Sequence, residues 1–320
     1  MEKFDFKNFI RKYGTPLGTV LIFIIFSVVT DGFFSKTNLM NLLRQMSMLT
    51  IVAFGFTFVM AAGGFDMSVG KSIGLVNIIF AMIITSTGNF GLAFLAALAV
   101  GITIGLINGT LVAAIGLPDF IGTFAIGAIA YGVKMLITKG NPIYFRDPPK
   151  IVTFIGQGYI WEIPVPVIIM IVIFLISYFI LNKTKLGRRI YAIGGNPTAS
   201  LFAGIKVVKH RMITFIFSGL GVAIAAVIMT ARLNSGQPLA GQDYMLDTIA
   251  VVFLSTTMFG EGEPSARGAF VGALMISMLN NGLTMLNVPY YFQNITKGLV
   301  VIGAVMMAVV LGQKLRMKLL

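Results

Sequence analysis

The amino-acid sequence predicts an all-α, polytopic membrane protein, and three observations support this fold class. Of the 320 residues, 57% are hydrophobic and only 11% are charged, whereas soluble domains carry about 25% charge. The mean hydropathy is +0.92. The apolar residues gather in runs of about 20, the length at which a helix crosses roughly 30 Å of hydrocarbon. We therefore expect a single transmembrane domain over residues 1–320.

Ten such runs can be placed along the chain. The first follows four basic residues, Lys3, Lys7, Arg11 and Lys12, and lacks a small-residue cleavage site, which favours a retained span over a signal peptide. The fourth run is longer than one crossing needs, and the eighth is short. The ten expected spans are Pro16–Phe34, Met46–Ala62, Ser72–Thr87, Phe90–Ile115, Phe120–Thr138, Ile163–Leu181, Met212–Ala231, Met245–Phe259, Ala266–Leu286 and Phe292–Leu311.

The distribution of basic residues predicts the orientation of these spans. With both termini in the cytoplasm, sixteen of the 24 Lys and Arg residues fall on the inner side and eight, including Lys134, on the outer side. Segment 183–211 is the most basic inner segment, and segment 139–162 is the longest outer loop. A division into two sets of five spans would make the halves inverted repeats, and a short echo between Val100–Gly109 and Val271–Gly282 supports that division.

Several function classes are excluded by composition and spacing. The chain has no cysteine and one histidine, His210, so we expect no thiolate or multi-histidine metal site and no cofactor. The stretch Gly63–Ser72 has the ingredients of a phosphate loop, but five residues separate Gly64 from Gly70 and an apolar helix precedes it. We therefore expect no ATP site and no enzyme activity. The net charge of +13 lies mostly in loops and indicates membrane topology, not nucleic-acid binding.

Polar residues at the span ends are candidates for a solute path or gate. Asp66 and Ser68 follow the second span, where either side chain can cap the next helix at a solvated cytoplasmic boundary; a part in the inner gate is the alternative. Asp247 begins the eighth span, where the helix dipole favours an acid. Amides in lipid need partners, so they either join helices or line a path for a polyhydroxylated solute. The path and gate candidates are Gly63, Gly64, Asp66, Ser68, Asn108, Asp247, Asn280 and Asn281.

Glycines recur at four-residue spacing within two spans. Gly101, Gly105 and Gly109 form one series, and Gly268 and Gly272 form another. Small residues at this spacing let helix backbones approach closely in lipid. Close packing is the expected role, and a moving interface with smooth surfaces is the alternative.

Several motifs together resemble one family. GGFDMSVG at 63–70 is similar to the Gly-Gly-(Ile/Phe)-Asp-Leu-Ser-Val-Gly signature of ribose/xylose-type permease subunits of ABC importers, to which branched-chain amino-acid permeases are more distantly related. Where that family carries Gly-Gly-Thr-Ser, this chain has FLSTT at 253–257 and then GEGEPS at 260–265. The resemblance continues in GLINGTLVAAIGLPDFIGTFA (105–125), GRRIYAIGGNPTASLFAGI (187–205), YMLDTIAVVF (244–253) and NNGLTMLNVPYYFQNITKGLVVIGAV (280–305).

The resemblance implies a permease subunit in the bacterial cytoplasmic (inner) membrane that works as a dimer of identical or sister chains. ABC ATPase subunits would dock inside, and a periplasmic or lipid-anchored sugar-binding protein would deliver a monosaccharide, such as a ribose-like pentose, outside. The alternatives are another small polar solute (a nucleoside, an autoinducer-type sugar or an amino acid), a stand-alone secondary transporter, or a structural membrane protein. A secondary transporter predicts buried ion-coordinating carboxylates, which are nearly absent from the spans.

The resemblance also assigns a coupling segment within 183–211. Residues 196–205 read as a short amphipathic element inside this basic stretch, which suits a surface that a cytoplasmic ATPase grips. The expected coupling residues are Gly194, Gly195, Asn196, Pro197, Ala199, Phe202, Ala203 and Gly204.

Overall fold

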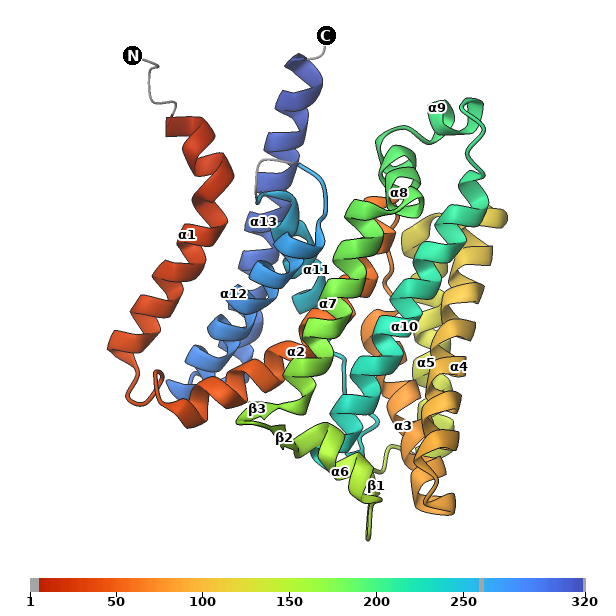
Figure 1. Ribbon diagram of the computed structural model, residues 1–320, viewed down its shortest axis with the longest axis vertical. Coiled ribbons are helices and arrows are strands. Elements are labelled where there is room, and N and C mark those ends of the chain that lie inside the picture. Colours follow the sequence, from red (N-terminus) through yellow and green to blue (C-terminus); the bar gives the residue numbers. More distant parts are fainter. Residues whose placement is uncertain (1–5, 259–261, 319–320) are drawn as a thin grey trace. The chain divides into compact units, whose positions relative to one another are not determined.

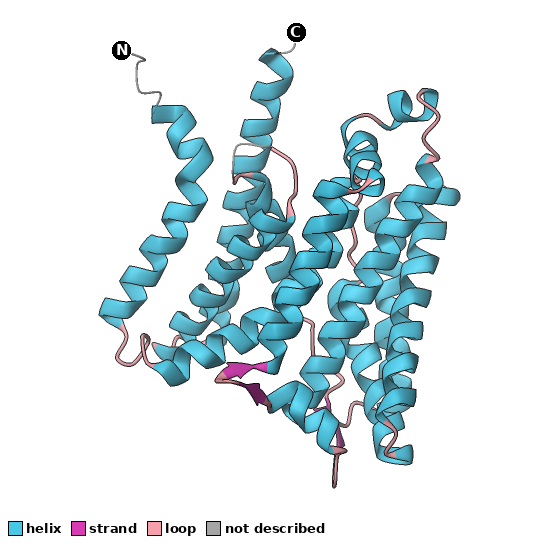
Figure 2. Ribbon diagram, in the orientation of Figure 1, coloured by secondary structure: helices cyan, strands magenta, loops and turns pink. Residues whose placement is uncertain are grey.

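The computed structural model describes residues 6–258 and 262–318, with side chains described for residues 15–258 and 262–306. Helices dominate this part of the chain, and short strands form two antiparallel pairs, β1 with β4 and β2 with β3 (Figure 2). The helices are α1 (Phe6–Val29), α2 (Lys36–Ala61), α3 (Val69–Thr87), α4 (Phe90–Gly109) with the π-helical turn η1 (Thr110–Ala114), α5 (Asp119–Thr138), α6 (Lys150–Gln157), α7 (Val165–Lys183), α8 (Lys185–Gly195), α9 (Pro197–Phe202), α10 (Val207–Leu233), α11 (Tyr244–Thr256), α12 (Ala266–Met285) and α13 (Tyr290–Lys318). The strands are β1 (Ile143–Tyr144), β2 (Tyr159–Ile160), β3 (Ile163–Pro164) and β4 (Ser235–Gly236).

Within the described residues, seven helices are long and apolar enough to cross a membrane, as expected for a polytopic helical protein. Two further expected spans, Pro16–Phe34 and Met245–Phe259, correspond to shorter apolar helices, Thr15–Val29 within α1 and α11. The tenth, Phe292–Leu311, lies on α13. The seven long candidates are α2, α3, α4 with η1, α5, α7, α10 and α12.

The helix bounds differ from the expected spans at three places. The first helix ends at Val29, and the second begins at Lys36 and therefore includes Arg44. The basic segment 183–211 is largely helical, since α8, α9 and the first turn of α10 lie within it. Basic side chains at a span end can extend to the membrane surface while their backbone stays helical, so hydropathy alone underestimates helix length. Gly260 and Glu261 of the divergent GEGEPS stretch lie outside the described residues.

The chain packs as two units, Met1–Met46 with Leu246–Leu320, and Ser47–Met245. In the second unit α10 packs against α4, α3 and α6 (Figure 1). Gly101 and Gly105 on α4 allow this contact, because a Cβ at either position would collide with the backbone carbonyl oxygen of Gly219 or Phe215 on α10. The close-packing prediction is therefore confirmed for this glycine series.

In the first unit, α12 packs against α1 and α11. A Cβ at Gly268 of α12 would lie only 2.6 Å from the carbonyl oxygen of Ser255 on α11. Asn38 of α2 and Asn281 of α12 exchange reciprocal amide hydrogen bonds of 3.0 Å. Asn281 therefore joins two helices, as amides in lipid are expected to do.

A non-helical segment follows α10 and runs back along α3. Its start, Gly236, lies against Ala81, and its end, Gly241, lies against Gly70. These α3 positions are eleven residues apart, which corresponds to roughly 16 Å along the helix axis. Between them, the Asn77 side chain accepts the backbone N–H of Gln237 at 2.7 Å. Asn77 and the glycine contacts thus hold this segment against α3, and α11, which begins at Tyr244, is one of the shorter apolar helices.

Lys134 lies beside this segment. It was expected among the outer basic residues, but it sits within α5 with a fully buried side chain. Its Nζ is 3.4 Å from the carbonyl oxygen of Lys71. The Nζ atom of Lys134 also lies beside Gly74. A Cβ built at Gly74 would lie about 3 Å from the backbone carbonyl oxygens of Pro238 and Ala240, so these oxygens lie in the same region. These carbonyl groups provide the polar surroundings that a buried ammonium group needs.

Candidate coupling and gate site

The expected coupling residues lie on α8, α9 and the turn that follows them. Asn196 caps α9 by accepting the backbone N–H of Ala199 at 2.9 Å, and Pro197 takes the first helical position, where its missing N–H is harmless. Gly204 ends the helix with φ of +81°, a conformation that glycine adopts without strain. Phe202 is 85% exposed. This short helix thus presents an apolar tip at one end of the second unit, opposite α6 (Figure 1).

Gly194 connects this segment to the break between α2 and α3. A Cβ at Gly194 would collide with the carbonyl oxygen of Ala61, the last residue of α2, and would lie 3.2 Å from the backbone nitrogen of Gly63. Gly63 has φ of +72°, so the chain turns at this contact. The structure therefore brings a predicted coupling residue into backbone contact with a predicted gate residue. By contrast, a Cβ at Gly195 would meet nothing within 4 Å.

The same break is held by the carboxylate of Asp119, the first residue of α5. Nη2 of Arg211, on α10, lies 3.0 Å and 2.9 Å from its two oxygens. Oδ2 also accepts the backbone N–H of Phe65 at 2.9 Å. The side chains of the pair are about one fifth exposed, so the ion pair is partly shielded from water. It connects α5, α10 and the turn after α2 at one point.

Asp66, the residue after Phe65, is the centre of a buried polar cluster. Its Oδ1 accepts the backbone N–H of Ser68 at 2.9 Å and the Ser68 hydroxyl at 2.6 Å, and its Oδ2 accepts the Ser218 hydroxyl at 2.7 Å. Asn108, on α4, donates to the Ser68 Oγ at 2.8 Å. The four side chains are at most 2% exposed. This cluster links the α2–α3 break to α4 and α10.

The surroundings of Asp66 correct its expected position at a solvated boundary. Burial raises the pKa of the Asp66 carboxyl above its ordinary value; hydrogen bonds from Ser68 and Ser218 oppose this rise, and the charge of Asp119 adds to it. The Asp66 side chain binds the N–H of Ser68, the residue just before α3, and the Ser68 side chain makes no cap bond, so the predicted cap through Ser68 is wrong. Asp66 is thus a buried structural junction at the expected break.

Two further path candidates, Asp247 and Asn280, belong to a separate network in the first unit. Asp247 of α11 accepts hydrogen bonds through Oδ2 from Asn280 at 2.9 Å and from Lys297 of α13 at 3.2 Å. Asp247 is 7% exposed. Asp247 therefore forms an ion pair with Lys297, in addition to the expected position of an acid at the start of a helix. Of the predicted path and gate residues, Asp66, Ser68 and Asn108 thus share one network in the second unit, and Asp247 and Asn280 share another in the first. Asn281 pairs instead with Asn38.

Sequence reasoning missed five residues of these contacts: Asp119, Ser218, Arg211, Lys297 and Asn38. Arg211 was counted only among the basic loop residues, and Ser218 lies in an apolar run that gives no sign of a buried partner. Ser218 and Asp66 are 152 residues apart in the chain. Helical periodicity pairs only residues three or four apart, so it could not have found these contacts.

Comparison with known proteins gives one consistent result. A family model described as "Branched-chain amino acid transport system / permease component" matches residues 38–310. The chain is 38% identical to the ribose import permease protein RbsC of Bacillus subtilis, over 96% of this chain and 95% of that protein. It is 34% identical to the D-allose transport system permease protein AlsC of Escherichia coli over 95% and 93%, and 32% identical to the xylose transport system permease protein XylH of Haemophilus influenzae over 92% and 95%. No solved structure matches the chain.

Proposed function

Since the chain belongs to the family of branched-chain amino acid transport system permease components, which are ABC transporter subunits without an ATPase domain, we propose that it is the permease of a carbohydrate importer. The ribose, allose and xylose permeases named above support a monosaccharide as the solute. Within that class we propose a ribose-like pentose or a related sugar. The alternatives remain a nucleoside, an autoinducer-type sugar or an amino acid.

The observation that carries the proposed mechanism is the contact of Gly194 with the α2–α3 break. An ATPase subunit would grip α9 through the exposed side chain of Phe202. Because Gly194 has no side chain to separate α8 from Ala61, a displacement of α8 would reach the turn at Gly63 directly. Binding of the ATPase could shift the equilibrium between two states only through contacts that differ between those states, and this junction is a place for such contacts.

From the turn at Gly63, two polar junctions would carry the displacement into the spanning helices. The Arg211–Asp119 pair connects the turn to α5 and α10. The Asp66 cluster connects it to α4 and α10. We propose that these junctions form part of the inner gate, and that Asp247, Asn280 and Asn281 contribute polar groups to the solute path in the first unit.

The assembly we propose has ten spans in one permease domain, with both termini in the cytoplasm and the two sets of five spans inverted. Two permease copies, identical or sister chains, would pair in the inner membrane. ABC ATPase subunits would bind the cytoplasmic side at α9, and a periplasmic or lipid-anchored sugar-binding protein would dock outside at segment 139–162. The arrangement of the second unit supports the sidedness, since α8 with α9 and α6 with β1 lie at opposite ends (Figure 1).

Reconstituted transport tests this function. The chain, its ATPase and its binding protein are placed in liposomes, and uptake of labelled ribose, xylose, allose, adenosine and leucine is measured with and without ATP. We expect ATP-dependent uptake of one monosaccharide that requires all three components. Sugar accumulation by the purified chain alone, driven by an ion gradient, would instead establish a secondary transporter.

A further inference from the structure

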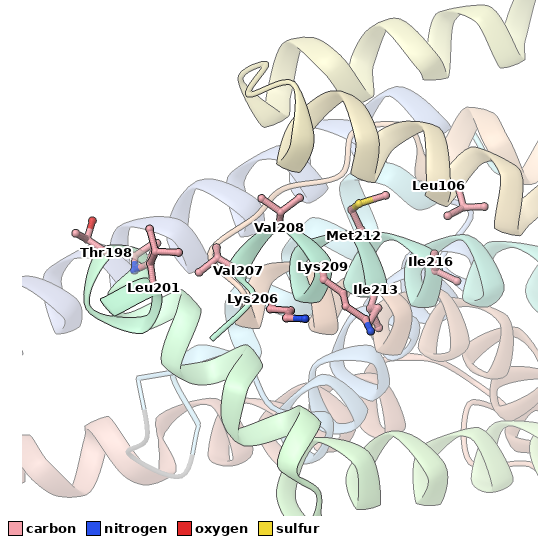
Figure 3. Close-up of a pocket in the computed structure, with 11 residues that line it drawn as sticks. Leu106, Thr198, Leu201, Lys206, Val207, Val208, Lys209, Met212, Ile213 and Ile216 are labelled. Atoms are coloured by element: carbon pink, nitrogen blue, oxygen red, sulfur yellow. The ribbon is translucent and has the colours of Figure 1, made fainter. Parts of the chain in front are cut away.

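A largely apolar groove of about 750 Å³ lies beside the coupling segment (Figure 3). Its walls come from α4, from α9 and from the first three turns of α10. Leu106 contributes from α4 and Leu201 from α9, while Met212, Ile213 and Ile216 contribute from α10. The groove therefore extends from the short cytoplasmic helix of the coupling segment to a level within the spanning part of α10.

The mouth of the groove is positively charged. Lys206 and Lys209 line it with exposed side chains, and among the described residues none of those lining it is acidic. Two neighbouring residues do not line the groove. Arg211 is paired with Asp119, and the His210 ring binds the carbonyl oxygen of Lys206 at 2.7 Å. The two lysines are thus the charged groups available at this site.

The position of the apolar wall indicates what can occupy the groove. Ile216 follows Lys209 by seven residues on α10, which places it roughly 10 Å deeper along the helix axis. Leu106 lies next to Gly105, whose backbone packs against Phe215 of α10, so this part of the wall belongs to the spanning bundle. An apolar wall that continues to the level of the spanning helices suits an acyl chain.

We propose that this groove binds one anionic phospholipid, with its phosphate at Lys206 and Lys209 and an acyl chain along Leu106, Met212 and Ile216. Basic pockets between helices on the cytoplasmic side of a membrane suit anionic headgroups. Lysine stems also pack on apolar surface while their ammonium groups stay at the interface. The bound lipid fills the space between α9 and α10 and braces the coupling segment against the spanning helix.

Native mass spectrometry of the purified full chain tests this site. The chain is released from detergent in the presence of phosphatidylglycerol or phosphatidylcholine, and the fraction that retains one lipid is measured. We expect retention of phosphatidylglycerol to weaken about thirtyfold in the Lys206→Gln, Lys209→Gln double variant, because each lysine contributes to binding an anionic headgroup. A Lys206→Arg, Lys209→Arg variant should keep the lipid.

The matched control is the Lys183→Gln, Lys185→Gln double variant, which removes the same charge from α7 and α8 without touching the groove. It should retain phosphatidylglycerol as the unchanged protein does. Ile216→Trp should displace the lipid, because the larger side chain fills part of the groove while both lysines remain. The proposal is overturned if the 206/209 variant keeps its lipid, if the control loses it equally, or if both lipids bind alike. It is also overturned if the groove variants change only the proportion of dimer, since a second copy would then be the occupant.

Discussion

Arg211 and Asp119, 92 residues apart in the sequence, meet at 2.9 Å where α5, α10 and the turn after α2 converge. The pair does more than join two helices, because the same Asp119 oxygen accepts the backbone N–H of Phe65. A partly buried carboxylate shared in this way fixes the position of the turn relative to both helices. The pair therefore joins the α2–α3 break to α5 and α10.

Breaking this pair should weaken coupling more than folding. Asp119→Asn keeps an oxygen for the Phe65 N–H but loses the charge, and Arg211→Met keeps the length of the stem. We expect each single variant to lower solute-stimulated ATP hydrolysis, and the double variant to lower it little further, because the residues act on one contact. Additive losses in this double-mutant cycle, measured with the reconstituted importer, would show that the residues act independently. Lys185→Met, at the start of α8, serves as a control for the loss of one positive charge.

The Asp66 cluster predicts a pH-dependent stability difference. Because burial raises the pKa of Asp66 in the folded chain, its contribution to stability is fully present below the ordinary value of 3.8 and is lost as pH rises through the raised pKa. Asp66→Asn mimics the protonated acid and does not titrate. The Tm of the unchanged protein minus that of Asp66→Asn should therefore fall as the pH rises from the ordinary value of 3.8 through the raised pKa. A difference that increases with pH, in thermal unfolding in detergent, would show that the carboxylate form is the stabilised one.

The hydrogen bond between the Ser218 hydroxyl and the Asp66 carboxylate can be tested by removing the hydroxyl. Ser218→Ala deletes the hydroxyl that donates to Asp66 Oδ2 at 2.7 Å, and the site is fully buried. The expected loss is about 1–3 kcal/mol, typical of a buried polar group left with one partner fewer. Thr284→Ala removes a hydroxyl that bonds only within its own helix in an exposed environment and should change the Tm much less. Equal losses of stability in Ser218→Ala and Thr284→Ala would mean that the buried cluster contributes no more than an exposed hydroxyl within one helix.

Lys134 should hold the non-helical segment Gly236–Gly241 against α3. Lys134→Met removes the donor near the carbonyl oxygens of Lys71 and Ala240 while keeping the side-chain volume. We expect Ala240→Cys, in a chain without native cysteines, to react faster with an impermeant maleimide when Lys134→Met is also present. Lys150→Met, at an exposed lysine on α6, is the matched control. An unchanged labelling rate would mean that Asn77 and the glycine contacts hold the segment without Lys134.

The sequence predicted the helical class and most spans for a physical reason. Lipid requires backbone hydrogen bonds to be satisfied within each span, so long apolar runs have few other outcomes. The cap and start of α9 could also be anticipated, since Asn196 and Pro197 act locally. The path of the segment that follows α10 could not be predicted, because it depends on distant contacts such as that of Asn77 with Gln237.

The junctions of the candidate site were less predictable. Gly63, Gly64 and Asp66 were identified through a motif, but their partners Arg211 and Ser218 follow from tertiary packing between distant segments. Lys134 was expected outside because positive charge is normally excluded from spans; its burial depends on carbonyl groups of a segment about 100 residues later in the chain. Pattern reasoning thus located the break in the chain but not what holds it.

The contact between Gly194 and Ala61 provides the most direct test of the coupling mechanism, because its neighbour offers a matched control. Gly194→Ala forces a methyl group against the Ala61 carbonyl, whereas Gly195→Ala adds the same group where no atom lies within 4 Å. The measurement is the number of solute molecules imported per ATP hydrolysed by the reconstituted importer. We expect this ratio to fall severalfold in Gly194→Ala, with ATPase binding retained, and to stay unchanged in Gly195→Ala. Normal coupling in Gly194→Ala would contradict a mechanical link between the coupling segment and the α2–α3 break.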